Sequence, residues 1–131
     1  MLDTSVALAF YSDTDAAHAD VAPYLLALED DLVTTPLVIA ELEQQLPRFG
    51  GRAAQEAFWT DLEQGAFTVR WWSTAMAETL VLARERPEVG LADASLLALA
   101  RLLGTDRIAT LDHRHFRPAR TVDGRPFTLV P

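Results

Sequence analysis

The sequence predicts an α/β fold in which helices flank a central, mostly parallel sheet. Short apolar or β-branched segments alternate with segments of helical length and spacing, which is the pattern of successive strand–helix units. Half of the 131 residues are apolar and 23% are charged, as in a globular protein with a substantial core. No repeat, linker or low-complexity segment divides the chain. We therefore expect a single domain over residues 1–131.

The first half of the chain predicts two short strands and three helices. The strands are expected at residues 1–2 and 32–35, and the helices at residues 6–10, between residues 16 and about 29, and at residues 37–49. Asp13-Thr14-Asp15 supplies N-cap side chains for the second helix. Pro36 suits a first helical position, and Gly50-Gly51 ends the third helix.

The second half continues the alternation. Helices are expected at residues 52–64, 74–86 and 91–103, and strands at residues 67–72, 107–111 and 127–130. Gly65, Pro87 and Gly104 mark the three helix ends. Ligands of parallel sheets bind at the carboxyl ends of the strands, so acidic residues at those ends are the first candidates for function.

Charge is distributed unevenly along this acidic chain, whose net charge is −8. Residues 1–47 carry −9, residues 48–100 carry −2 and residues 101–131 carry +3, and all eleven basic residues are arginine. Nucleic acid is held mainly by Lys and Arg contacts to phosphates, so this chain is not a generic polyanion binder. Either the partner is not nucleic acid, or cations and a local arginine surface overcome the repulsion.

The sequence also excludes several classes of site. There is no cysteine, which rules out a disulfide framework, a thiolate zinc site and a cysteine nucleophile. No apolar run reaches the roughly 18 residues that cross a bilayer, and no basic segment precedes an apolar one at the N-terminus. We expect a cytoplasmic protein that does not act at a membrane.

Asp3 and Asp112 follow two predicted strands, Met1-Leu2 and the strand that ends at Leu111. If both strands are central and parallel, their carboxylates emerge at the same edge of the sheet. The alternative for each residue is local: Asp3 can cap the helix after it, and Asp112 can cap a short turn over residues 113–116.

Two helical acids complete the candidate set. Asp93 is the only acid of its predicted helix and lies on the apolar side, near Leu96 and Leu97. A buried, unpaired carboxylate costs several kcal/mol, more than the roughly 0.3–1 kcal/mol that a helix N-terminus returns. Glu41 borders the apolar stripe of the helix over residues 37–49, where a surface role is the alternative. Glu43 is expected to be solvated.

Convergence of Asp3, Glu41, Asp93 and Asp112 would require a counter-charge. Two carboxylates about 4 Å apart repel by about 4 kcal/mol at an effective dielectric near 20. One acid would then be protonated, or a divalent cation would bind. Oxygen ligands without cysteine select a hard ion, Mg²⁺ or Mn²⁺, whose open coordination positions suit phosphate oxygens and an attacking water. This is the chemistry of phosphodiester hydrolysis.

These residues carry a family resemblance. Asp3-Thr4-Ser5, Glu41 within residues 38–42, Leu91-Ala92-Asp93-Ala94, and Thr110-Leu111-Asp112 followed by Phe116 resemble the PIN domain, in order and over nearly the whole chain. The type is that of VapC toxins from type II toxin–antitoxin systems. Only Met1 and Leu2 precede Asp3, so the first strand is expected to be minimal, unless the native start lies upstream.

The resemblance implies a PIN-like three-layer sandwich and a Mg²⁺-dependent endoribonuclease, with Mn²⁺ as the alternative ion. It makes Asp3, Glu41, Asp93 and Asp112 the catalytic, metal-binding acids and gives Thr4, Ser5 and Thr110 supporting roles. It also implies an RNA substrate, a homodimer and a cognate antitoxin that silences the enzyme.

Other polar and aromatic residues give weaker predictions. Arg48 and Arg114 are candidates for contacts to RNA phosphates, ahead of Arg52 and Arg117; a solvated face or local ion pairing is the alternative. We expect His113 and His115 on the surface and His18 on a helix surface. We expect Trp71 and Trp72 in the core or a dimer interface rather than stacked on bases.

Three other functions fit parts of the pattern. A PIN-like nuclease acting on DNA or flapped structures uses the same acids, although the chain has no visible arch insertion for flaps. A non-catalytic PIN module binding RNA or a protein partner would have no reason to keep four repelling acids. A phosphatase of the haloacid dehalogenase type would need a second Asp two residues after the first, where this chain has Ser5.

Overall fold

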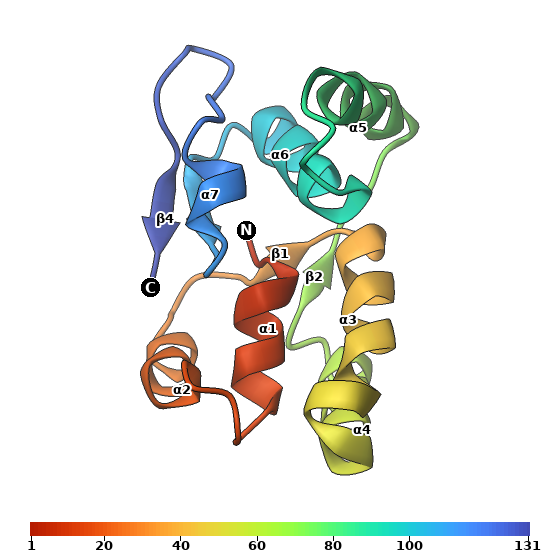
Figure 1. Ribbon diagram of the computed structural model, residues 1–131, viewed down its shortest axis with the longest axis vertical. Helices are drawn as coiled ribbons and strands as arrows, with labels where there is room; N and C mark the ends of the chain where they lie inside the picture. Colours follow the sequence, from red (N-terminus) through yellow and green to blue (C-terminus); the bar gives the residue numbers. More distant parts are fainter.

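The computed structural model describes residues 1–131 and has an α/β architecture (Figure 1). Its elements, in chain order, are α1 (Thr4–Tyr11), α2 (His18–Leu26), β1 (Val33–Thr34), α3 (Pro36–Phe49), α4 (Gly51–Glu63), β2 (Thr68–Val69), α5 (Ser73–Glu85), α6 (Leu91–Leu103), β3 (Arg107–Ala109), α7 (His113–Phe116) and β4 (Thr128–Val130). The predicted fold class is confirmed. No helix has both the length and the apolar character needed to span a bilayer.

The strands form two small parallel sheets, β1 with β2 and β3 with β4. The first residues of the chain join them. Leu2 N donates to Val33 O at 2.8 Å, Asp3 N donates to Ala109 O at 3.0 Å, and Leu2 forms a parallel bridge with Ala109. The segment therefore lies between β1 and β3, and the side chain of Asp3 leaves the backbone layer there.

Alternate residues of β3 point into two separate apolar cores, because side chains of a strand alternate between its faces. Ile108 packs in a core with residues of α5, α6 and α7, such as Phe116. Ala109 packs in a core with residues of α1, α2 and α4, such as Phe58. Helix α3 contributes to both cores, through Val38 to the first and Leu42 to the second. Helices thus cover both faces of the strand layer.

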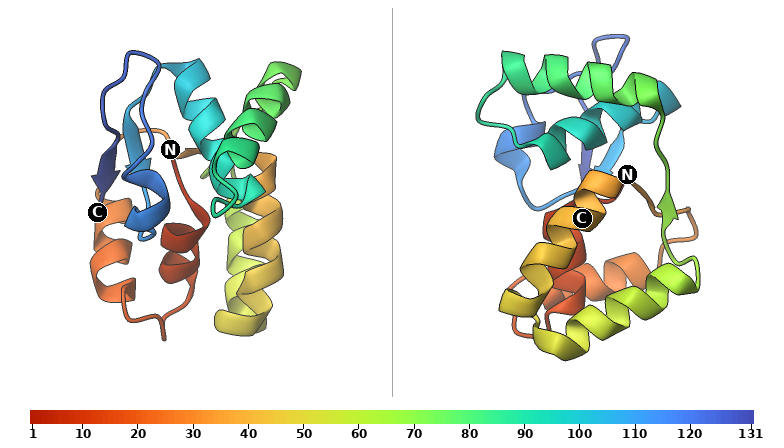
Figure 2. Two further views of the ribbon diagram at one scale, coloured as in Figure 1. Left: turned by 45° about the horizontal axis from the view of Figure 1, so that its top comes forward. Right: turned by 90° about the vertical axis from the view of Figure 1, so that its right-hand side faces the viewer.

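The helices pack in recognisable pairs. The views in Figure 2 show α5 lying across α6, and α4 beside α3. In Figure 1, the start of α3 lies near the α5–α6 pair and its end lies near α4. Thr35 caps the start of α3 by accepting from Val38 N at 3.2 Å, and Pro36 occupies the first turn as predicted.

The expected strand over residues 67–72 is shorter than predicted, and of the two places expected for Trp71 and Trp72, the core or a dimer interface, the structure excludes the core for Trp72. Only Thr68 and Val69 pair with β1, which is itself short because α3 begins at Pro36. Trp72 lies beyond the paired residues, immediately before α5, and its side chain is 43% exposed. The aromatic core contribution of this segment comes instead from Phe67, which is buried.

Candidate active site

All four predicted acids line one cavity of about 400 Å³. Asp3 lies at the N-cap of α1, Glu41 lies on α3, Asp93 lies in the first turn of α6, and Asp112 lies at the N-cap of α7. The strand–helix order brings these distant residues together, because Asp3 and Asp112 both follow paired residues of the strand layer.

Asp3 is buried and fully hydrogen-bonded. Its Oδ1 accepts from Thr4 N at 2.7 Å, and its Oδ2 accepts from Ser5 Oγ at 2.6 Å and from Thr110 Oγ1 at 2.7 Å. Asp3 therefore caps α1, as the local interpretation expected, and also faces the shared cavity. The capping role and the cavity position are compatible.

The supporting hydroxyls connect the acids to one another. Ser5 Oγ accepts from Leu111 N at 2.9 Å, and Thr110 Oγ1 accepts from Asp112 N at 3.0 Å. On the opposite side, Thr4 Oγ1 donates to Glu41 Oε2 at 2.5 Å. The orientation of Asp3 is thus coupled to the backbone at Asp112 and to the Glu41 side chain.

Asp93 is the electrostatically strained member of the cluster. Burial, followed by the charges of Asp3 and Glu41, raises the pKa of Asp93 to about 6, against an opposing effect of His115. None of the four carboxylates forms an ion pair with an arginine; the only such contacts are those of Asp93 and Asp112 with His115. The cavity therefore concentrates negative charge that the chain leaves almost uncompensated.

His115 belongs to the site, which corrects the expectation that it lies on the surface. Its side chain is only 16% exposed, and Nδ1 lies 2.8 Å from Asp93 Oδ2 and 3.1 Å from Asp112 Oδ2. Ionised carboxylates only accept, so Nδ1–H is the donor. Arg86 Nη1 donates to the carbonyl of His115 at 2.9 Å and anchors it from the other side.

The signal for His115 was present in its position relative to Asp112. Asp112 is the N-cap of α7, and its Oδ1 accepts from the backbone N of His115 at 3.3 Å. A capping residue and the residue three positions later lie against each other. His113, by contrast, contacts Arg117 at 3.4 Å and no carboxylate.

Three further polar residues lie in environments that differ from those predicted from the sequence. Glu43 is half-buried rather than solvated, because it accepts from Gln55 Nε2 at 2.6 Å and Trp59 Nε1 at 2.7 Å and so links α3 to α4. The predicted N-cap role of Asp13-Thr14-Asp15 is wrong, because the N-cap of α2 is Ala17 and no side chain caps it. Asp15 instead accepts from Ala17 N at 2.8 Å in the preceding turn and also lines the acidic cavity. His18 Nδ1 contacts Ala9 O at 2.8 Å and is not free on the surface.

The candidate RNA-contacting arginines separate into two groups. The side chains of Arg48 and Arg114 form no hydrogen bond or ion pair within the chain, although the Arg48 guanidinium lies 5.5 Å from the centroid of the Phe49 ring. Arg52 pairs with Glu56 and lies 4.7 Å from the Trp59 ring centroid. The first two therefore retain free guanidinium donors.

The donor set of the cavity matches a hard divalent cation. Four carboxylates supply oxygen ligands, and the charges of Asp3 and Glu41 add to the effect of burial in raising the pKa of Asp93. As they stand, no three His, Asp or Glu side chains are close enough together to surround one metal ion. Ion binding would require these carboxylates to draw closer.

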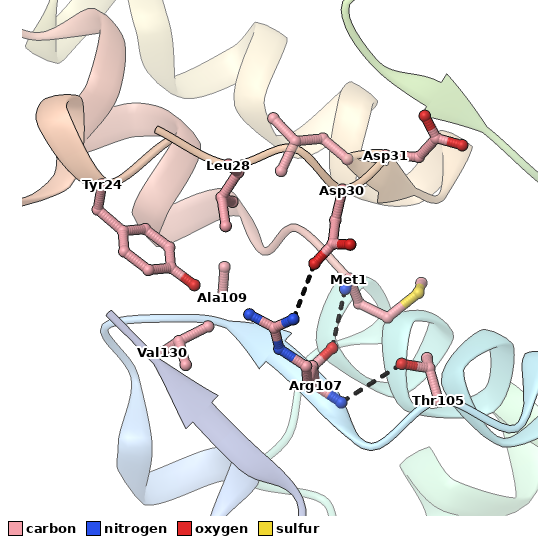
Figure 3. A pocket seen from close by; sticks show the side chains of 10 residues that line it. Met1, Tyr24, Leu28, Asp30, Asp31, Thr105, Arg107, Ala109 and Val130 are labelled. Atoms are coloured by element: carbon pink, nitrogen blue, oxygen red, sulfur yellow. Dashed lines mark hydrogen bonds and ion pairs between the residues drawn. The ribbon is translucent and has the colours of Figure 1, made fainter. Parts of the chain in front are cut away.

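A second cavity, of about 290 Å³, lies where β3 begins (Figure 3). Its lining is mostly apolar and includes Tyr24 and Leu28. Arg107, its one basic side chain, pairs with Asp30 at 2.8 Å. None of the predicted site residues lies in this cavity.

Comparisons with known proteins agree with the family resemblance found in the sequence. A family model described as the PIN domain matches residues 1–121. Ribonuclease VapC26 of Mycobacterium tuberculosis (strain ATCC 25618 / H37Rv) is 33% identical, over 100% of this chain and 99% of the relative. The crystal structure of Mycobacterium tuberculosis VapC20, described as a Sarcin-Ricin loop cleaving toxin, has a TM-score of 0.78 and 22% identity, and the match covers 95% of this chain and 98% of that one. This last likeness is one of fold.

Proposed function

The chain belongs to the PIN-domain family, with a VapC ribonuclease as a full-length relative, and from this premise we propose that it is an endoribonuclease toxin that hydrolyses RNA phosphodiester bonds. The observation that carries the proposal is the convergence of Asp3, Glu41, Asp93 and Asp112 on one cavity without an arginine counter-charge. A binding scaffold gains nothing from such repulsion, whereas a cation-dependent hydrolase requires it.

We propose Mg²⁺, or alternatively Mn²⁺, as the cofactor held by these four acids. The raised pKa of Asp93, whose largest cause is burial, supports this assignment, because a nearby dication would offset the charges of Asp3 and Glu41 that add to the shift. When bound, such an ion activates water for attack and stabilises the charge that develops on phosphate oxygens.

The surrounding residues orient the acids. Ser5 and Thr110 hold Oδ2 of Asp3, and Thr4 holds Glu41, so that these carboxylates keep their directions. Arg48 and Arg114 have free guanidinium groups and are proposed to contact RNA phosphates near the acidic cavity. Their positive charges would offset part of the repulsion between the RNA and this acidic chain.

The partners of the protein follow from family membership. We propose a cognate antitoxin protein that silences the enzyme, a homodimer as the functional assembly, and a cytoplasmic location. Co-expression with the protein encoded by a neighbouring small reading frame tests the first of these; loss of ribonuclease activity in the co-purified complex is the expected result.

The test of the activity is a cleavage assay on structured and unstructured RNA with Mg²⁺, Mn²⁺ or EDTA. Cleavage that requires the divalent ion, is lost in Asp93→Asn and persists in Asp31→Asn is expected, because Asp31 is exposed and lies outside the acidic cavity. Tight RNA binding without cleavage in any divalent ion would instead indicate a non-catalytic module. Faster cleavage of single-stranded DNA than of RNA would indicate a DNA nuclease.

A further inference from the structure

The acidic cavity continues into two further hollows along the exposed face of α3. Glu41 lines both the acidic cavity and a hollow of about 340 Å³, and Gln45 lines both the acidic cavity and a hollow of about 500 Å³. Gln44 lines both of these outer hollows. Residues spaced three or four apart share a helix face, so Glu41, Gln44, Gln45 and Arg48 form one continuous strip.

The chemistry of this strip changes with distance from the acids. Beyond Glu41 come two glutamine amides, neither of which forms a side-chain hydrogen bond within the chain. The last hollow is lined only by Gln44, Gln45, Arg48 and Phe49. Its single charge is therefore the positive charge of Arg48, in contrast to the negative cavity at the other end of the strip.

The Phe49 side chain is exposed to solvent, and the contact that the fold makes with this residue through its backbone does not need an aromatic ring. Phe49 is 54% exposed, and the guanidinium of Arg48 lies 5.5 Å from the centroid of its ring. Its contact with the rest of the fold includes a backbone one, in which the carbonyl accepts from Ser12 Oγ at 2.8 Å. The side chain is thus available to a ligand, and any residue at this position would keep the backbone contact.

We propose that Gln45, Arg48 and Phe49 form a subsite for single-stranded RNA, in which a base stacks on Phe49 and Arg48 contacts a phosphate. The inference rests on the proposed function and extends it to a named RNA-binding surface. Free cationic donors next to an accessible aromatic ring are the recurring composition of single-stranded nucleic-acid sites. At a rise of 1.5 Å per residue, Phe49 lies about 12 Å along the helix axis from Glu41, so a strand crossing the acids would reach it.

The test measures binding of a fluorescent single-stranded RNA oligonucleotide to the full chain in EDTA, by anisotropy, across a salt series. Phe49→Ala is expected to raise Kd by about 5- to 150-fold, as expected for loss of one base stack. Phe49→Trp should restore the affinity. Arg48→Gln is expected to lower the magnitude of the log Kd against log salt slope by about 0.7, the value for one phosphate contact on a single strand.

Two matched controls lie on or next to α5, outside the α3 strip. Trp72→Ala removes another exposed aromatic ring, and Arg84→Gln removes another arginine without an ion pair. Both should bind RNA as the unmodified chain does, and circular dichroism should show each variant folded. An unmodified chain without measurable affinity for the oligonucleotide, or a Phe49→Ala variant with unchanged Kd, overturns the subsite.

The subsite and the proposed function fail separately. If the unmodified chain cleaves RNA in Mg²⁺ but Phe49→Ala binds RNA with unchanged Kd, the proposed function stands and the subsite is wrong. If Phe49→Ala weakens RNA binding but the unmodified chain cleaves no RNA with any divalent ion, the subsite stands and the proposed function is wrong. If Phe49→Ala no longer binds the antitoxin but still binds RNA with unchanged Kd, the surface binds a protein partner, and this also overturns the inference.

Discussion

The two cavities beside β3 differ in whether their charged side chains have ion-pair partners. Where the strand begins, the basic side chain of Arg107 is paired with Asp30, and the lining is mostly apolar. Just beyond the end of the strand, the four predicted acids and Asp15 share one cavity, and His115 is the only basic partner, bridging Asp93 and Asp112. The cavity at the start of the strand thus pairs its one guanidinium with a carboxylate and leaves only the exposed Asp31 without a partner, whereas the cavity beyond the end of the strand gathers acids that have no arginine partner. The acidic cavity is the one for which we propose a bound cation.

The sharpest way to test this contrast is to remove one acid. Asp93→Asn should lower metal-dependent RNA cleavage by more than about 100-fold, because even residues that only orient metal ligands contribute up to that much. Arg107→Gln at the other cavity should leave cleavage unchanged, since it breaks only an exposed ion pair. Equal losses in both variants, measured as kcat/KM, would remove the distinction between the regions.

His115 tests whether the acidic cavity is organised before an ion binds. His115→Ala should weaken Mn²⁺ binding by about 10- to 100-fold, because Nδ1 orients both Asp93 and Asp112. Isothermal titration calorimetry with Mn²⁺ measures the effect without RNA. His113→Ala is the matched control, because His113 lies on the same short helix and contacts no carboxylate. Unaltered Mn²⁺ affinity in His115→Ala would show that Asp93 and Asp112 bind the ion without being oriented by His115.

The raised pKa of Asp93 predicts an unusual pH dependence of stability in EDTA. The pKa is about 6 in the folded chain against an ordinary 3.8, so the folded state binds this proton more tightly than the unfolded state. The contribution of Asp93 to stability therefore rises as pH falls through about 6 towards 4. The difference in Tm between the unmodified chain and Asp93→Asn should change across this range. A difference that is constant from pH 4 to 8 would contradict the shift.

The smallest effect is expected at the apolar cavity. The Tyr24 hydroxyl is buried without a hydrogen-bond partner, so Tyr24→Phe should stabilise the chain by about 1 kcal/mol or leave stability unchanged. Urea unfolding measures this, and RNA cleavage should stay the same. Destabilisation by Tyr24→Phe would mean that this hydroxyl has a partner, and the contrast between the cavities would weaken.

The sequence predicted most of what local patterns can encode. The alternation of apolar segments gave the α/β class, and strand-terminal or apolar-face positions singled out Asp3, Asp93 and Asp112. Their convergence could be expected because parallel strands end at one edge of a sheet. Arg48, named from the sequence as a candidate for phosphate contact, lies on the α3 strip together with Glu41.

Properties that depend on neighbours from other elements were not predictable in this way. Glu43 is half-buried because α4 brings Gln55 and Trp59 against it, and nothing in the sequence near Glu43 announces this contact. Trp72 is exposed because the partner strand is too short to extend the pairing. His115 is the intermediate case, since its capping relation to Asp112 was visible but its contact with Asp93 depends on how α6 meets α7.

The hydrogen bond between Asp3 and Thr110 joins positions 107 residues apart. Contacts of such separation form late, because the intervening chain must first be closed into a loop. During synthesis, the side chains of Asp3 and Glu41 leave the ribosome long before Thr110, Asp112 and His115 exist. The acidic cavity of a growing polypeptide is therefore incomplete until the segment that carries Thr110, Asp112 and His115 has been made.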